Sequence, residues 1–126
     1  MRMIEDSNLG SYFSIIQATP DIFKYYLMAD VFVCNSYNES YPRVVLMAMQ
    51  FELPIITTPV YGIQDQVKDK INALFYETAN TEDLSAKLLT LGQDKALREK
   101  FSDNSLSVIG MINNHEEMVN LSLIHI

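Results

Sequence analysis

A polar stretch with the residue types of a ligand site follows a short apolar run in the first half of the chain. Residues 31–34 are continuously apolar, and residues 35–43 then bring together amide, hydroxyl and carboxylate side chains, one proline and one arginine. Pro42 suits the first turn of a helix, whose free backbone amides at Arg43 and Val44 can receive a phosphate group. The guanidinium of Arg43 adds a positive charge there. A phosphate site is therefore one interpretation of this stretch, and an ordinary helix cap is the other.

Other residue types that commonly carry chemistry are sparse. Cys34, the single cysteine, has no partner for an internal disulfide, and its apolar neighbours indicate a buried core thiol. His115 and His125 lie ten positions apart, without the cysteine or carboxylate spacing of a metal site. We expect no metal and no cofactor.

The elements that would position these residues alternate along the sequence. Short apolar segments predict strands at 13–17, 31–34, 54–58 and 73–76. Apolar residues at helical spacing predict helices at about 20–28, 42–49 and 64–68, from a cap at Thr81, and from about 95 toward 111, with Thr19 capping the first. Continuously apolar strands separated by helices are typical of a parallel sheet covered on both faces. The predicted fold class is therefore α/β, a Rossmann-like parallel sheet with flanking helices.

Ligands of such sheets bind beyond the carboxyl ends of the strands, which directs attention to the loops after residues 34, 58 and 76. The second of these loops contains Gly62, which permits a close approach of the backbone to a ligand. An ordinary turn glycine explains Gly62 equally well.

Composition excludes several classes of protein. The chain has 126 residues, 48% of them hydrophobic, which suffices for the core of one domain. A formal net charge of −7 argues against a nucleic-acid partner. No apolar run approaches the roughly 20 residues that span a bilayer, and the first residues lack the apolar segment of a signal peptide. We expect a cytoplasmic protein, with peripheral membrane association of the full-length protein left open.

The order of motifs closely resembles that of the group 1 glycosyltransferases, from about residue 13 to residue 101. The resemblance is carried by Ala-Asp-Val-Phe-Val at 29–33, Ser36, Glu-Ser-Tyr-Pro at 39–42, Ala-Met at 48–49, Leu-Pro at 53–54 and Thr57. These are retaining enzymes of the GT-B type, which has two Rossmann-like domains. The resemblance implies that residues 13–120 are part of the C-terminal, nucleotide-sugar-binding domain. It also implies that the parent enzyme transfers a sugar from a nucleoside diphosphate sugar to an acceptor (glycan, lipid or small molecule) that the sequence does not identify.

The resemblance also assigns roles within the candidate site. Glu39 matches the family carboxylate that faces the donor sugar, where it accepts hydrogen bonds from sugar hydroxyls, with Ser40 and Tyr41 beside it. The amides of Arg43 and Val44, with the Arg43 side chain, are expected to hold the diphosphate. Outside this resemblance, Glu39 would be read as a solvated loop carboxylate.

Two positions depart from the family pattern. Met47 stands where the family has a second glutamate that binds the nucleotide ribose, so Met47, with Gly62, is expected to line the nucleotide pocket by apolar contact alone. Glu52 replaces the glycine of the family's Gly-x-Pro turn, at an expected cost of about 1 kcal/mol in a left-handed backbone. Met47 marks either a degenerate paralogue, which would make this a noncatalytic binding domain with a degenerate glycosyltransferase fold, or a sequencing error in one codon. A GT-B nucleotide-sugar epimerase is a separate enzyme alternative.

Both ends of the chain look incomplete. Residues 1–12 are poorly defined and lack the strands, and the Arg and Lys that clamp the donor diphosphate, with which this domain normally opens. Residues 121–126 coincide with one translated frame of the transposase adaptor used in DNA library preparation, which indicates an adaptor-derived tail. We therefore expect a fragment that is inactive by itself and that associates through an exposed sheet edge.

Overall fold

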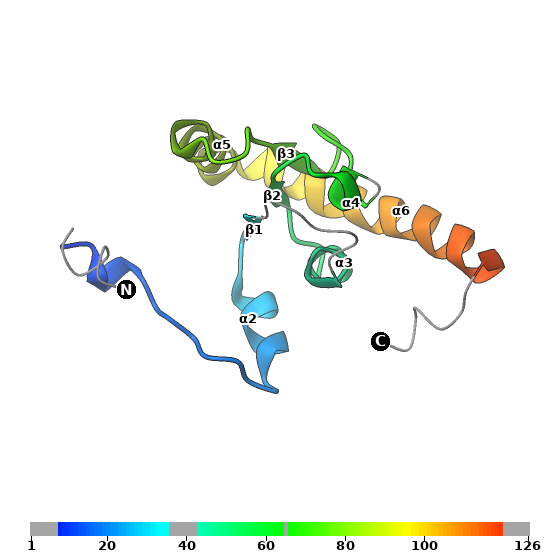
Figure 1. Ribbon diagram of the computed structural model, residues 1–126, viewed down its shortest axis with the longest axis horizontal. Helices are drawn as coiled ribbons and strands as arrows, with labels where there is room; N and C mark the ends of the chain where they lie inside the picture. The colour runs from blue at the N-terminus through cyan, green and yellow to red at the C-terminus, as the bar shows by residue number, and fades with distance from the viewer. Residues whose placement is uncertain (1–7, 36–42, 65, 120–126) are drawn as a thin grey trace.

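A computed structural model describes residues 8–35, 43–64 and 66–119 (Figure 1). Its elements, in chain order, are η1 (Gly10–Tyr12), α2 (Ile22–Met28), β1 (Phe32–Cys34), α3 (Arg43–Gln50), β2 (Ile55–Thr57), α4 (Tyr61–Gln64), β3 (Ala73–Phe75), α5 (Thr81–Gln93) and α6 (Lys95–Val119). The strands form one parallel sheet in the order β1-β2-β3. Strands alternate with helices, so the predicted α/β class is confirmed.

Helices cover both faces of the sheet. Successive strand residues point to opposite sides, so the continuously apolar strands place apolar side chains on both faces. Ile55 lies in a cluster with buried residues of α3 and of the later part of α6. Its neighbour Ile56 lies in a second cluster with Leu91 of α5 and Phe101 of α6. The long helix α6, yellow to orange in Figure 1, therefore contributes to both clusters. Cys34 is 7% exposed in the first cluster, which confirms the predicted core thiol.

The strand predicted at residues 13–17 is wrong. Phe13 has extended backbone angles, but no described strand lies beside this segment to complete its backbone hydrogen bonds. Phe13, Ile15 and Ile16 are 52%, 58% and 48% exposed. An apolar segment forms a strand only where a neighbouring strand pairs with its backbone. This segment has no such partner among the described strands and runs outside the body of the molecule (Figure 1).

Two helices begin at other residues than predicted. Thr19 accepts a hydrogen bond from the Asp21 amide at 3.2 Å, yet α2 begins only at Ile22, so Asp21 is its N-cap residue. Thr81 is the first residue of α5, and the cap is Asn80, whose side chain accepts from the Asp83 amide at 2.9 Å. Threonine, aspartate and asparagine are all favoured at the N-cap position, so a sequence with two of them near a helix start leaves the cap uncertain by a residue or two.

The short helix predicted at 64–68 lies earlier, in α4. The amides of Ile63 and Gln64 donate to the carbonyl of Val60 at 3.0 and 3.2 Å, which starts the turn before the expected place. A further turn follows, since Val67 donates to the Ile63 carbonyl at 3.1 Å, and both side chains are buried. Burial of this pair, four residues apart, sets the position of the helix.

Candidate functional site

The carboxyl ends of the strands form a level edge. Cys34, Thr57 and Phe75 are paired in register as the last residues of β1, β2 and β3. Because each strand is followed by a helix that leads back across the sheet, the N-termini of α3, α4 and α5 lie on this side. Parallel sheets bind ligands at this edge, so it is the first place to examine.

A hydrogen bond connects the two outer strands at this edge. The hydroxyl of Tyr76, just after β3, donates to Oδ1 of Asn35, just after β1, at 2.6 Å. Tyr76 is 2% exposed, whereas Asn35 is exposed. Sequence reasoning missed this pair, although a tyrosine and an asparagine directly after two strands of one sheet is a signal that could have found it.

The middle of the edge is filled by protein. Thr57 and Thr58 are fully buried, and the Thr57 carbonyl accepts a hydrogen bond from the Tyr76 amide at 3.0 Å. Among the described residues, these two threonines present no exposed side chain to a ligand. A ligand at this edge would therefore lie above Thr58, against the connections that leave the sheet.

The first turn of α3 presents the predicted phosphate-binding group to solvent. Arg43 and Val44 are exposed, whereas Val45, Ala48 and Met49 are buried against the sheet. The first backbone amides of a helix have no acceptor within the helix. An exposed first turn that carries an arginine suits an anion, so diphosphate binding by Arg43 and Val44 stays a prediction compatible with the geometry.

The other predicted site residues differ in what the structure says of them. Met47 is half-buried on α3 and packs against the first cluster, the one that contains Cys34 and Ile55. Gly62 is buried as the second residue of α4, so of its two interpretations the ordinary turn glycine is wrong, because the helix begins before it. Its role in a nucleotide pocket stays a prediction. Glu39, Ser40 and Tyr41 lie outside the described residues.

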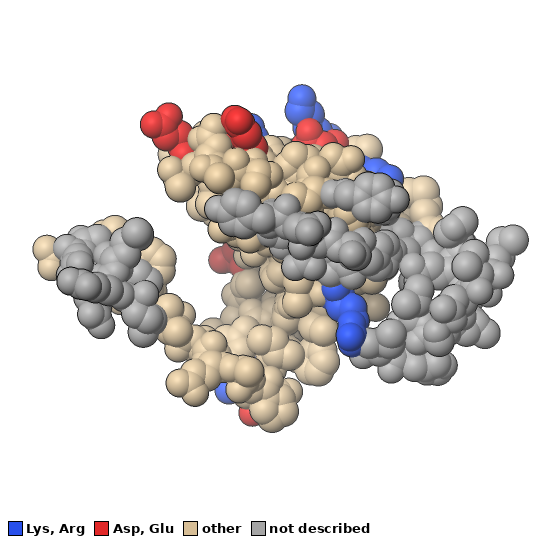
Figure 2. Space-filling model, in the orientation of Figure 1, with Lys and Arg blue, Asp and Glu red and all other residues tan. Residues whose placement is uncertain are grey.

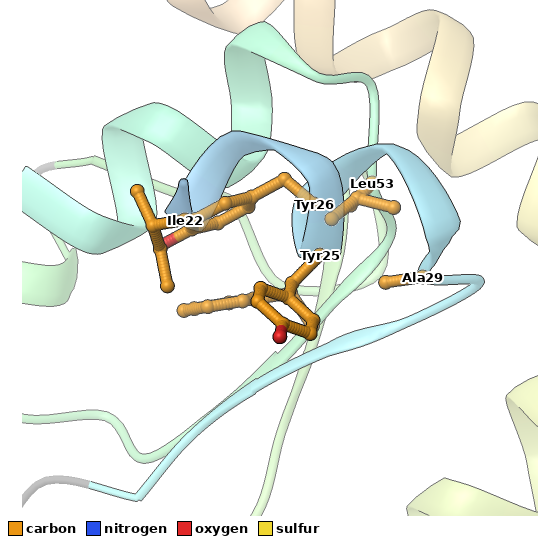
Figure 3. A pocket seen from close by; sticks show the side chains of 6 residues that line it. Ile22, Tyr25, Tyr26, Ala29 and Leu53 are labelled. Atoms are coloured by element: carbon orange, nitrogen blue, oxygen red, sulfur yellow. The ribbon is translucent and has the colours of Figure 1, made fainter. Parts of the chain in front are cut away.

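An apolar hollow of about 180 Å³ lies at the opposite edge of the sheet (Figure 3). Its lining comes from α2 and from the start of the first two strands: Ile22, Tyr25, Tyr26, Ala29, Phe32 and Leu53. The ring of Tyr26 stacks on Phe32 and Phe51 with centroids 5.7 and 5.5 Å apart. Burial, and to a smaller extent the neighbouring Cys34 thiol, raise the pKa of Tyr26. The hollow offers no charged side chain and lies away from Asn35 and Tyr76.

Charged residues give no metal site in the part of the chain that the structure describes. No group of three His, Cys, Asp or Glu side chains there is placed to hold a metal ion. Acidic side chains visible in Figure 2 lie over α5, further along the upper side and at the lower end of the molecule. Among the described helices, none has the length and apolar character to cross a membrane.

Comparison with known proteins decides the family. The model of the family "Glycosyl transferases group 1" matches residues 2–108. The chain belongs to this family. An N,N'-diacetylbacillosaminyl-diphospho-undecaprenol alpha-1,3-N-acetylgalactosaminyltransferase of Campylobacter jejuni is 31% identical over 88 residues, which are 70% of this chain and 23% of the relative. The Staphylococcus aureus capsular polysaccharide biosynthesis glycosyltransferase CapM is 29% identical over 71% of this chain and 24% of its own length.

Solved structures of glycosyltransferases share the fold. The crystal structure of Anabaena Alr3699/HepE in complex with UDP-glucose superposes with a TM-score of 0.85 at 16% identity, over 99% of this chain and 35% of that one. By comparison, this group 1 glycosyltransferase chain spans about a quarter of the length of the two curated relatives, from Campylobacter jejuni and Staphylococcus aureus. Its sheet corresponds to part of one Rossmann-like unit of the GT-B fold, since the chain covers 58% of a solved C-terminal domain of a group 1 glycosyltransferase from Francisella tularensis, with a TM-score of 0.76 at 22% identity.

Proposed function

We propose that this glycosyltransferase chain binds the nucleoside diphosphate part of a sugar donor at the carboxyl edge of its sheet. The observation that carries the proposal is the exposed first turn of α3, with Arg43 and Val44, on the edge where parallel sheets bind ligands. Family membership supports the choice of a nucleotide sugar over another anion. Residues 13–120 are the proposed extent of this unit.

The roles of individual residues follow the family pattern. Arg43 and the amides of Arg43 and Val44 would hold the diphosphate, while Glu39, Ser40 and Tyr41 would face the sugar. Met47 and Gly62 would line the nucleotide pocket. No protein-bound cofactor is proposed.

For the full-length protein we propose transfer of the sugar to an acceptor with retention of anomeric configuration. The relatives act, by their names, on a lipid-linked diphosphate sugar and in capsular polysaccharide synthesis, which makes a glycan or lipid-linked glycan the first acceptor class to test. HepE was crystallised with UDP-glucose, so UDP-sugars are the first donors to test. A stabilising positive charge at the departing diphosphate is the part that Arg43 would contribute.

Titration calorimetry of the 126-residue chain with UDP, UDP-glucose and UDP-N-acetylglucosamine tests donor binding. We expect Arg43→Ala to weaken binding about tenfold, the loss of one charge-assisted contact. Lys100→Ala, which removes an exposed charge of the same sign on α6, is the matched control and should bind like the native chain. Binding that is absent with every nucleotide, or that Arg43→Ala leaves unchanged, would contradict the proposed site.

A noncatalytic binding domain is the second candidate, and Met47 favours it. A glutamate at this position would restore a carboxylate for the ribose hydroxyls. Binding by the native chain that Met47→Glu strengthens, and that Glu39→Ala weakens, supports a donor site that tolerates Met47. Binding seen only after Met47→Glu supports the degenerate domain.

A further inference from the structure

The hydrogen bond between Tyr76 and Asn35 assigns a further role at the same edge. We propose that the side-chain amide of Asn35 donates a hydrogen bond to an oxygen of the bound nucleotide sugar, and that Tyr76 is a positioning residue that holds Asn35 for this contact. The inference rests on the proposed donor site and adds two residues that family resemblance did not point to.

The position of Asn35 in the fold carries the first step. Asn35 directly follows Cys34, the last residue of β1, and begins the connection that ends at Arg43 of α3. It therefore lies on the ligand-binding side of the sheet, within the same connection as the proposed diphosphate group. Its side chain is exposed at this edge, in contrast to the buried Thr58 after β2.

The hydrogen-bonding groups of Asn35 carry the second step. An asparagine side chain has one carbonyl oxygen, which accepts, and one NH₂ group, which donates two hydrogen bonds. Tyr76 donates to the oxygen Oδ1 at 2.6 Å. The group that remains for a ligand is the Nδ2 donor pair, and diphosphate and sugar hydroxyl oxygens are suitable acceptors.

The packing of Tyr76 carries the third step. Its ring is 2% exposed within the cluster that Ile56, Leu74, Leu91 and Phe101 form under α5 and α6. A ring fixed in this way holds its hydroxyl in one place, so the side chain of Asn35 is oriented before a ligand arrives. Orientation in advance lowers the entropy cost of binding, which is how Tyr76 would raise affinity without touching the ligand.

Calorimetric titration of the 126-residue chain with UDP and UDP-glucose tests both roles. Asn35→Asp keeps an acceptor for Tyr76 but replaces the donor by a negative charge, so we expect binding to weaken more than about tenfold at unchanged melting temperature. Tyr76→Phe keeps the buried ring and should weaken binding by about three- to tenfold. The matched controls are Asn8→Asp and Tyr12→Phe at exposed positions outside the sheet, and both should bind like the native chain.

A double-variant cycle separates positioning from a merely structural effect. In an Asn35→Ala chain the added Tyr76→Phe change should alter the melting temperature but not the affinity, because no side chain remains to be positioned. Native binding that Arg43→Ala weakens and Asn35→Asp does not would overturn this inference and leave the proposed donor site standing. Affinity losses of Tyr76→Phe and Asn35→Ala that simply add would overturn the positioning role. Absence of any nucleotide binding by the native chain would overturn both proposals.

Discussion

The backbone amide of Leu53 donates a hydrogen bond to the carbonyl oxygen of Ala48 at 3.0 Å and closes the end of α3. The amide of Glu52 donates to the Met49 carbonyl, also at 3.0 Å. This pair of bonds is the Schellman arrangement, which places one residue in the left-handed backbone region. Glu52 occupies that place with φ of 59°. The sequence-based expectation of a non-glycine residue in a glycine position is confirmed.

Replacing Glu52 by glycine should therefore stabilise the chain. A residue with a Cβ atom pays about 1 kcal/mol in the left-handed region, which Glu52→Gly would recover. Urea unfolding followed by circular dichroism measures the difference. Glu52→Ala removes the same carboxylate but keeps Cβ, so it should leave the free energy of unfolding nearly unchanged, and an equal gain in both variants would point to charge instead of backbone strain.

Removal of the Asn72 side chain should destabilise the chain. Asn72 is fully buried; its Oδ1 accepts from the Lys68 amide at 2.8 Å and its Nδ2 donates to Ser105 Oγ at 3.4 Å. Asn72→Ala leaves the Lys68 amide and the buried Ser105 hydroxyl without these partners, at a cost of about 2–3 kcal/mol in the free energy of unfolding. Denaturant unfolding at pH 7 is the measurement.

Asn104 provides the comparison for Asn72, because both amides join the loop before β3 to α6. Nδ2 of Asn104 donates to the Ile71 carbonyl at 2.8 Å in an exposed contact. Water can replace this bond, so Asn104→Ala should cost under about 1 kcal/mol. Equal losses for the two variants would show that burial does not set the value.

Stability at acid pH should depend on Asp83. Its carboxylate accepts from the Glu77 amide at 2.8 Å and pairs with Lys87 at 3.3 Å. Mainly the Glu77 amide, with help from Lys87, holds the pKa of Asp83 below its ordinary value of 3.8. Since the unfolded chain then binds the proton more tightly, this stabilisation is complete above the ordinary pKa and is lost as the pH falls through the lower folded-state pKa.

Urea unfolding at a series of pH values from 7 down to 2 tests this dependence. Asp83→Asn should reduce the loss of stability on acidification. Lys87→Met should keep most of that loss, because the backbone amide of Glu77 is the larger cause of the shift. The assignment fails if Lys87→Met flattens the pH profile as much as Asp83→Asn does.

The sequence predicted those parts of the fold that depend on local pattern. Three continuously apolar strands, the α/β class and the buried Cys34 were predicted because burial on two sheet faces leaves a clear signature. The segment at 13–17 has the same signature but no neighbouring strand among the described residues. A local sequence pattern does not show whether a distant segment will pair with it. The start of α4 was misplaced for a related reason, since burial of Ile63 and Val67 decides it.

The candidate site stays a prediction, and only its place in the fold can be compared with the structure. Proline and arginine at the start of a helix after a buried strand indicate Arg43 and Val44 from sequence alone. The contact between Tyr76 and Asn35 joins residues 41 positions apart. Finding it requires the order and register of the strands, which bring the ends of β1 and β3 to the same level.

The chain should associate through its unpaired segments. β1 pairs with β2 on one side, and no described strand lies on its other side. Val33 of β1 is 38% exposed, and Ile15 and Ile16 on the extended segment are more exposed, at 58% and 48%. No charged residue occurs between Asn8 and Pro20 to oppose pairing with another chain.

Size-exclusion chromatography with light scattering should therefore show a mass that rises with concentration. Lysine at both positions, Ile15→Lys with Ile16→Lys, should shift the chain toward the monomer, whereas Leu106→Lys on exposed α6 should not. A native chain that stays monomeric at every concentration would show that the open edge of β1 is no association site.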